Sequence, residues 1–238
     1  MKKELSVKQK NPDKDLNIIL FSTLIPLIIY LIFGNNIMNF SKISEINIWL
    51  RFIPVMFIQF GLAGLGSLIV ICYRKEKLKE YGLVKNNFFK TIILSLVVCI
   101  PSMIFLLMNN EINSYLPLKG CIFTKLFLSS NFPTNILGYI LIIFVWGFAE
   151  GFNYVVISKK INERYISKNK WLNYGAIACG LVGVLIHGMI GFNLYTLFEA
   201  LTTFIIIYGM LIVKEKTNNA WGCIFIFLFF YFFGMLYN

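Results

Sequence analysis

Residues 146 to 191 read WGFAEGFNYVVISKKINERYISKNKWLNYGAIACGLVGVLIHGMIG. They place two ionisable side chains, Glu150 and the only histidine, His187, inside apolar runs long enough to cross a bilayer. Ionisable groups are costly in lipid, so such residues face protein or a cavity and mark either a functional site or a polar contact between helices. The sequence leaves both interpretations open.

Small residues recur every four positions in the second of these runs. They are Gly175, Cys179, Gly183 and Gly191, with His187 in the same row. A ridge of small residues lets another helix approach closely. The pattern therefore predicts that His187 faces protein.

The first run has polar residues one turn after its glutamate. Asn153 and Tyr154 follow Glu150 at the spacings that put side chains on one side of a helix. That side of the helix can hold a carboxylate by hydrogen bonds.

Composition determines the class of protein. Of the 238 residues, 58% are hydrophobic and only 14% are charged, whereas soluble domains carry about a quarter of charged residues. The five cysteines show no CxxC pairing, so neither a disulfide framework nor a thiolate metal site is indicated. The sequence predicts an integral, all-α membrane protein.

The apolar runs predict a polytopic bundle of about seven transmembrane helices. The runs are Leu16 to Gly34, Ile48 to Tyr73, Thr91 to Met108, Asn135 to Ile157, Trp171 to Ile190, Asn193 to Val213 and Ala220 to Tyr237. Short interfacial or re-entrant helices are expected between Tyr73 and Lys90 and between Cys121 and Leu128. We divide the chain into a polar N-terminal segment, 1–15, and one helical domain, 16–238.

Basic residues alternate from one connection to the next. Eighteen of the 22 lie in the N-terminal segment and in the connections after the second, fourth and sixth runs. The positive-inside rule then predicts a cytoplasmic N-terminus. The formal charge of +11 is explained by topology, so we expect membrane lipids as partners and no nucleic acid. We expect the chain in the plasma membrane of a prokaryote.

The candidate chemistry centres on Glu150 and His187. A glutamate and a histidine in a dry pocket can form a general base with its partner, or can bind a divalent metal such as zinc around an activated water. A zinc site of three histidines is excluded because the chain has one histidine. Asn153, Tyr154 and Asn193 are candidate supporting residues, and Glu199 is a further candidate carboxylate.

From about Lys77 to Phe230 the chain resembles the CAAX-processing and bacteriocin-immunity (CPBP) family of intramembrane proteases. The matching landmarks are Gly82-Leu83 before a helix, a glutamate motif around Glu150, a histidine motif at His187, and a turn with Thr217 and Trp221 before the last helix. The resemblance implies a helical membrane endopeptidase whose Glu/His site opens to the cytoplasm and acts on membrane peptides or proteins.

The glutamate motif, of EExxxR type in the family, fits in two registers. If Glu150 is the first glutamate, Gly151 replaces the second and Val155 the arginine. If Glu150 is the second, Ala149 replaces the first and Tyr154 the arginine.

The other motifs also depart from the family. Gly183 stands where the histidine motif has phenylalanine, and Phe227 and Tyr231 stand where the last helix has histidine and an amide or acid. In the family that last pair is placed to stabilise the oxyanion, and losing such a donor costs ~3 to 4 kcal/mol. The resemblance implies a protease with Glu150 and His187 as base and partner. The alternative is a proteolytically inactive protein that binds a partner, as an immunity or regulatory factor would.

Depth gives His187 a second candidate partner. Helix rise places Glu150 roughly 10 Å from the cytoplasmic end of its helix. It places His187 about 24 Å from the cytoplasmic end of its own helix, counted from Trp171. Across the turn near Gly191, Glu199 falls at a depth similar to that of His187. A His187–Glu199 hydrogen bond that joins two helices is therefore an alternative to the Glu150–His187 pair.

Overall fold

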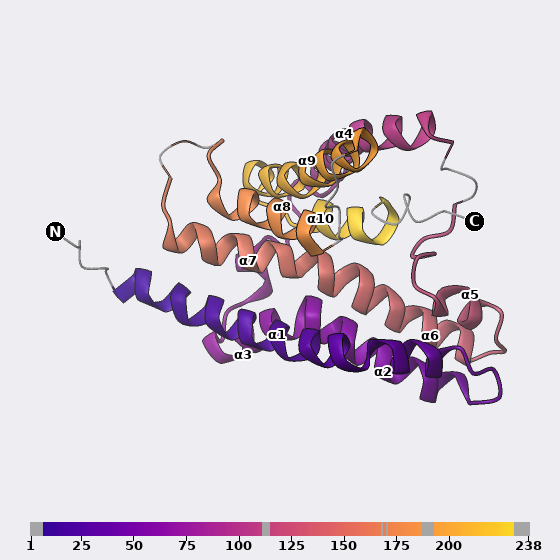
Figure 1. Cartoon of the computed structure of the whole chain (residues 1–238). Coiled ribbons are helices and arrows are strands. Elements are labelled where there is room, and N and C mark those ends of the chain that lie inside the picture. The colour runs from indigo at the N-terminus through magenta and orange to yellow at the C-terminus, as the bar shows by residue number, and fades with distance from the viewer. Residues whose placement is uncertain (1–6, 111–114, 168, 170, 187–192, 231–238) are drawn as a thin grey trace.

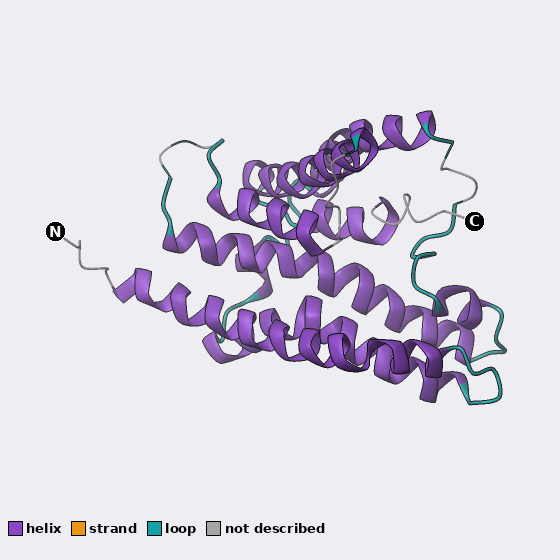
Figure 2. Cartoon of the chain, in the orientation of Figure 1, coloured by secondary structure: helices purple, strands orange, loops and turns teal. Residues whose placement is uncertain are grey.

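The structure, a computed structural model, describes residues 7–110, 115–167, 169, 171–186 and 193–230. Its regular elements within these ranges are all helical, which confirms the predicted all-α class (Figure 2). They are α1 (Val7–Ser41), α2 (Ile48–Phe60), η1 (Gly61–Leu65), α3 (Gly66–Arg74), η2 (Leu78–Tyr81), α4 (Phe88–Met108), α5 (Phe123–Leu128), α6 (Thr134–Ile142), η3 (Ile143–Ala149), α7 (Glu150–Arg164), α8 (Tyr174–Ile186), α9 (Leu194–Thr217), α10 (Trp221–Phe225) and η4 (Ile226–Phe230).

Five helices in these ranges are long and apolar enough to cross a membrane. They are Asn11–Ser41, Ile48–Arg74, Phe88–Met108, Thr134–Arg164 and Leu194–Thr217. The chain is therefore an integral membrane protein by helix length and composition. The count of seven is not established: α8 has 13 residues, and the last predicted span, which runs to Tyr237, is described only as far as Phe230.

Helix α7 lies between two groups of helices (Figure 1). Helices α1, α2 and α3 lie on one side of it, while α8, α9 and α10 lie on the other together with α4. Helix α7 packs directly on α1, α8 and α10. A side chain on α7 can therefore face either group.

Serine meets glycine where three pairs of helices cross. A Cβ on each glycine would lie within 2.6 Å of the serine Oγ, in the pairs Gly66–Ser22 for α3 and α1, Gly175–Ser158 for α8 and α7, and Gly222–Ser95 for α10 and α4. Small residues of this kind allow helix backbones to approach closely. The contact of Gly175 with α7 confirms that the small-residue ridge of α8 faces protein.

A second apolar cluster forms around α5, where the sequence predicts a short re-entrant or surface helix. Phe127 of α5 packs so closely on Gly138 of α6 that a Cβ there would lie 2.0 Å from its ring. The buried members of the cluster are Phe52, Leu118, Cys121, Phe123, Phe127, Ile142, Val145 and Trp146. Helix α5 thus closes one end of α2 and α6.

Connections rich in lysine lie together near the C-terminal end of α7. Lys160, near the end of α7, pairs with Glu76, which follows α3, at 2.7 Å. The side chain of Asn219, before α10, donates to the backbone oxygens of Val84 at 2.8 Å and Asn86 at 2.7 Å. The connections after α3, α7 and α9 therefore share one end of the bundle, called the basic end below.

Candidate functional site

Glu150 and its main contact lie next to two π-helical turns. Glu150 follows η3 directly, and Gln59 precedes η1 by two positions. The two turns pack on each other, since a Cβ on Gly64 would lie 2.9 Å from the Ala149 Cβ. Single π-helical turns inside α-helices are frequent at functional sites.

Two hydrogen bonds join α7 to the continuous helix Ile48–Arg74, which comprises α2, η1 and α3. Gln59 Nε2 donates to Glu150 Oε2 at 2.9 Å, and the Ser67 hydroxyl donates to Asn153 Oδ1. Glu150 and Asn153 are each only 8% exposed. These four residues are called the polar seam below. Within it, Glu150 and Asn153 share one side of α7, as their spacing predicts.

Sequence reasoning missed Gln59 and Ser67. The signal that could have found them is their spacing of eight residues inside an apolar run, because residues eight apart lie on one side of a helix.

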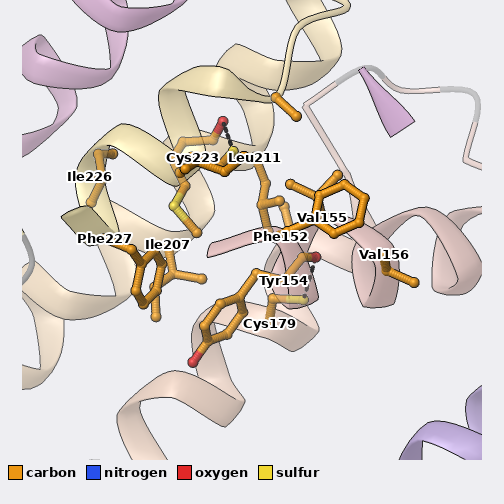
Figure 3. Close-up of a cluster of buried hydrophobic side chains, with 14 of the residues drawn as sticks. Phe152, Tyr154, Val155, Val156, Cys179, Ile207, Leu211, Cys223, Ile226 and Phe227 are labelled. Atoms are coloured by element: carbon orange, nitrogen blue, oxygen red, sulfur yellow. Dashed lines mark hydrogen bonds between the residues drawn. The ribbon is translucent and has the colours of Figure 1, made fainter. Parts of the chain in front are cut away.

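Tyr154 lies in the hydrophobic core, near Cys179 and Phe227 (Figure 3). Its ring stacks on Phe227 with centroids 5.4 Å apart, and its backbone oxygen accepts from Cys179 Sγ at 3.6 Å. A Cβ on Gly183 would lie 3.5 Å from its hydroxyl oxygen. Tyr154 therefore connects α7 to α8 and η4.

The positions at which the family has further catalytic residues are packing positions here. A Cβ on Gly151 would lie 3.1 Å from the Cys223 backbone oxygen and 3.2 Å from the Phe227 ring, so α10 and η4 fill the space of a second glutamate. Val155, at the arginine position of that register, is completely buried. In the other register Ala149 forms the contact with η1.

The remaining predicted residues lie on α9 or outside the described residues. His187 and Tyr231 are outside them, and so are both hydrogen bonds proposed for His187. Asn193 caps α9, because its Oδ1 accepts from the Thr196 backbone N–H at 2.8 Å. Glu199 is half-buried in the first turns of α9, where its backbone oxygen accepts from Thr202 Oγ1 at 3.0 Å.

No group of three or more His, Cys, Asp or Glu side chains that could hold a metal ion occurs among the residues that the structure describes. Within that part of the chain, the Glu150 carboxylate accepts a hydrogen bond from the Gln59 amide. Zinc held by Glu150 would also require His187, which lies outside that part.

A second polar cluster lies at the basic end and was not predicted. Its centre is Lys160, whose side chain is 2% exposed and pairs with Asp15 at 3.1 Å and with Glu76 at 2.7 Å. Buried lysines are rare unless they are paired. The cluster therefore fixes the positions of three segments that are far apart in the sequence.

No protein-family model, curated protein or solved structure matches the chain. The resemblance to the CPBP family rests on the sequence landmarks. The fold brings two of them together, Gly82-Leu83 and the turn with Thr217 and Trp221. The Ala220 N–H, beside Trp221, donates to the Gly82 backbone oxygen at 2.8 Å.

Proposed function

We propose that this chain is a CPBP-like intramembrane endopeptidase in which Glu150 is the general base and His187 is its partner. The observation that carries the proposal is a carboxylate 8% exposed within a candidate membrane span, held by one neutral donor. Ionisable groups in such positions are functional by default. The substrates are membrane-associated peptides or proteins.

Gln59 supports the base by fixing its orientation. Its amide contacts Oε2, and Oε1 is the oxygen that receives a proton from water. The hydroxide formed adds to the peptide carbonyl carbon, and the protonated Glu150 then delivers its proton to the leaving amine nitrogen. Because Gln59 is uncharged, it holds the carboxylate without forming an ion pair that would weaken the base.

Asn153 is the candidate polar group beside the base. It lies on the same side of α7 and is itself oriented by Ser67. Its amide N–H groups are therefore available as hydrogen-bond donors to an oxyanion, a role that the missing last-helix histidine has in the family.

A divalent metal such as zinc would take Glu150 and His187 as ligands. A carboxylate and an imidazole are ordinary zinc ligands, and such an ion would lower the pKa of its bound water. No third candidate ligand joins Glu150 in the described part of the chain, so the mechanism above uses the side chains alone.

We also propose that the chain lies in a prokaryotic plasma membrane with its N-terminus in the cytoplasm. The positive-inside rule supports this orientation, because the lysine-rich connections share the basic end.

A second candidate function, a proteolytically inactive membrane protein that binds a partner, is favoured by the packing at Gly151. There and at Phe227, two positions that carry catalytic side chains in the family contribute to close helix packing. Such packing keeps the fold and removes the groups that stabilise the transition state.

Peptide cleavage distinguishes the two functions. The full chain, reconstituted in liposomes, is incubated with a quenched fluorescent peptide that carries a prenylated CAAX sequence and with a quenched membrane-spanning peptide. The endopeptidase proposal expects cleavage of at least one peptide, its loss in His187→Ala, and its retention in the control Glu45→Gln, which changes an exposed loop carboxylate. Equal fluorescence with wild type and with empty liposomes would favour the partner-binding function.

A further inference from the structure

The N-terminal part of α1 is fixed by buried charges. Lys160 Nζ lies 3.1 Å from Asp15 Oδ2, and both side chains are only 2% exposed. Arg74 Nε donates to Asp15 Oδ1 at 2.7 Å, Lys160 donates to Glu76 Oε1 at 2.7 Å, and the Tyr81 hydroxyl donates to Glu76. These five residues are called the ionic latch below.

The latch joins α1 to two other helices. Asp15 belongs to α1, Arg74 ends α3, and Lys160 lies in α7. Removing one member of a buried charge pair leaves its partner buried without compensation, which is strongly unfavourable. The latch therefore holds α1 on α3 and α7 while its charges stay paired.

Beyond the latch, the described polar contacts of α1 are more exposed or weaker. Asp13, which is 42% exposed, pairs with Arg164 of α7, and the backbone oxygens of Asn11 and Ser41 accept from arginines at 3.2 and 3.3 Å. Thr23 Oγ1 lies 3.4 Å from the Leu62 backbone oxygen, at the long end of the hydrogen-bond range. Only 6% of the most apolar window of α1 is buried, compared with 22% to 61% for the other four candidate spans. In a membrane most of α1 faces lipid. Its close contacts at Gly61 and Gly66 replace lipid contacts of similar polarity, so they oppose its displacement less than they would in water.

Helix α1 lies along the two helices that carry the polar seam (Figure 1). Gln59 and Ser67 are on the α2–η1–α3 side of the seam, and Glu150 and Asn153 are on the α7 side. Helix α1 packs on α2, η1, α3 and α7. Displacing it therefore exposes to lipid the line along which those helices meet.

We propose that α1 is a movable cover over the polar seam, held at the basic end by the ionic latch, and that a membrane-embedded peptide segment reaches Glu150 when the cover opens. The identity of the entering segment rests on the proposed peptidase function. The movement of the cover does not depend on it, so the two can be tested separately.

The test measures distances from α1 to α3 in liposomes by pulsed electron spin resonance. Spin labels replace Leu31 on α1 and Leu68 on α3, which are 74% and 47% exposed. A second labelled pair, Leu68 with Ile93 on α4, reports on the rest of the bundle. Cys72 is replaced by serine, and the other four cysteines are buried and not available for labelling.

Asp15→Asn breaks the latch at α1, because it removes the ion pairs of Asp15 with Lys160 and with Arg74 and keeps the shape of the side chain. The matched control, Asp13→Asn, removes the more exposed ion pair between Asp13 and Arg164. We expect one narrow α1–α3 distance distribution in the wild type and in Asp13→Asn, and an added longer-distance population in Asp15→Asn. The α3–α4 distances should be the same in all three proteins.

An α1–α3 distribution in Asp15→Asn that matches the wild type would overturn the proposal. Broadening of both the α1–α3 and the α3–α4 distances would also overturn it, because the latch would then be a general folding contact. Neither result depends on peptide cleavage, so a protein without peptidase activity can still show or lack the opening of α1.

Discussion

Gln59 and Glu150 form a hydrogen bond of 2.9 Å although 91 positions separate them in the sequence. The bond crosses from the end of α2 to the start of α7, beside two π-helical turns that pack on each other. It gives a carboxylate inside a membrane span a fixed orientation.

Gln59→Leu should destabilise the protein because it leaves the buried Glu150 carboxylate without its amide donor. The expected loss is about 1 to 3 kcal/mol, measured as a lower thermal unfolding temperature in detergent. The same substitution should cost much less in a Glu150→Leu background, in which no carboxylate remains to be satisfied. An equal loss in both backgrounds would mean that the hydrogen bond does not contribute to stability.

Gly151→Ala should destabilise the contact between α7 and α10. The added Cβ lies 3.1 Å from the Cys223 backbone oxygen, which cannot move without its helix, so we expect a loss of about 1 to 3 kcal/mol. The control is Gly34→Ala, where the added Cβ meets only the exposed Tyr30 ring. Equal unfolding temperatures for the two variants would contradict the close packing at Gly151.

Membrane topology can be tested with single cysteines in a Cys72→Ser background. A cysteine at position 77 should be protected from a membrane-impermeant maleimide in intact cells, and a cysteine at position 119 should react, because the proposed orientation places the basic end in the cytoplasm. Permeabilised cells are the control and should label both positions. Labelling of position 77 in intact cells would contradict the orientation.

The positions of the spans were predictable because an apolar run of the right length is a local signal. The run Ile48 to Tyr73 and the continuous helix Ile48–Arg74 agree closely. The start of the fifth run differs from the structure, because the run begins at Trp171 whereas α8 begins at Tyr174, where Asn173 Oδ1 accepts from the Ala176 N–H.

The polar contacts were not predictable from the sequence. The hydrogen bonds of Gln59 with Glu150 and of Lys160 with Glu76 span 91 and 84 positions, and no helical periodicity connects such distant residues. The distribution of basic residues assigns Lys160 to a connection between helices. In the structure it is buried between the carboxylates of Asp15 and Glu76. Tyr154 has the spacing of a partner for Glu150, yet packing on Phe227 determines its direction.

The ionic latch should weaken in acid. Burial raises the pKa of Glu76, but hydrogen bonds from Lys160 and Tyr81, with the charges of Lys160 and Lys159, lower it to a net value below its ordinary 4.5. A lowered folded-state pKa stabilises the fold above the unfolded-state pKa, and this stabilisation is lost as pH falls through the folded-state value. Unfolding temperatures should therefore fall below about pH 4.5, and the fall should be smaller in Glu76→Gln.

Asp15 and Glu163 also pair with Lys160, and Arg74 pairs with Asp15. All three residues are identical in both proteins, so the difference between the two pH profiles reports on Glu76. Tyr81 acts in the opposite direction. Burial, and then its hydrogen bond to Glu76, raise the pKa of Tyr81 well above its ordinary value of 10, so its stabilising effect is present below pH 10 and is lost only at higher pH. Parallel acid profiles for the wild type and Glu76→Gln would rule out this role for Glu76.

The most direct measurement compares peptide cleavage by the wild type and by Glu150→Gln in the same liposomes. The amide keeps the shape of the side chain and can still bond to Gln59, but it cannot accept the proton of water. If Glu150 is the general base, the cleavage rate should fall at least ~100-fold with an unchanged unfolding temperature. A Glu150→Gln variant that cleaves at the wild-type rate would contradict the assignment of Glu150 as the base.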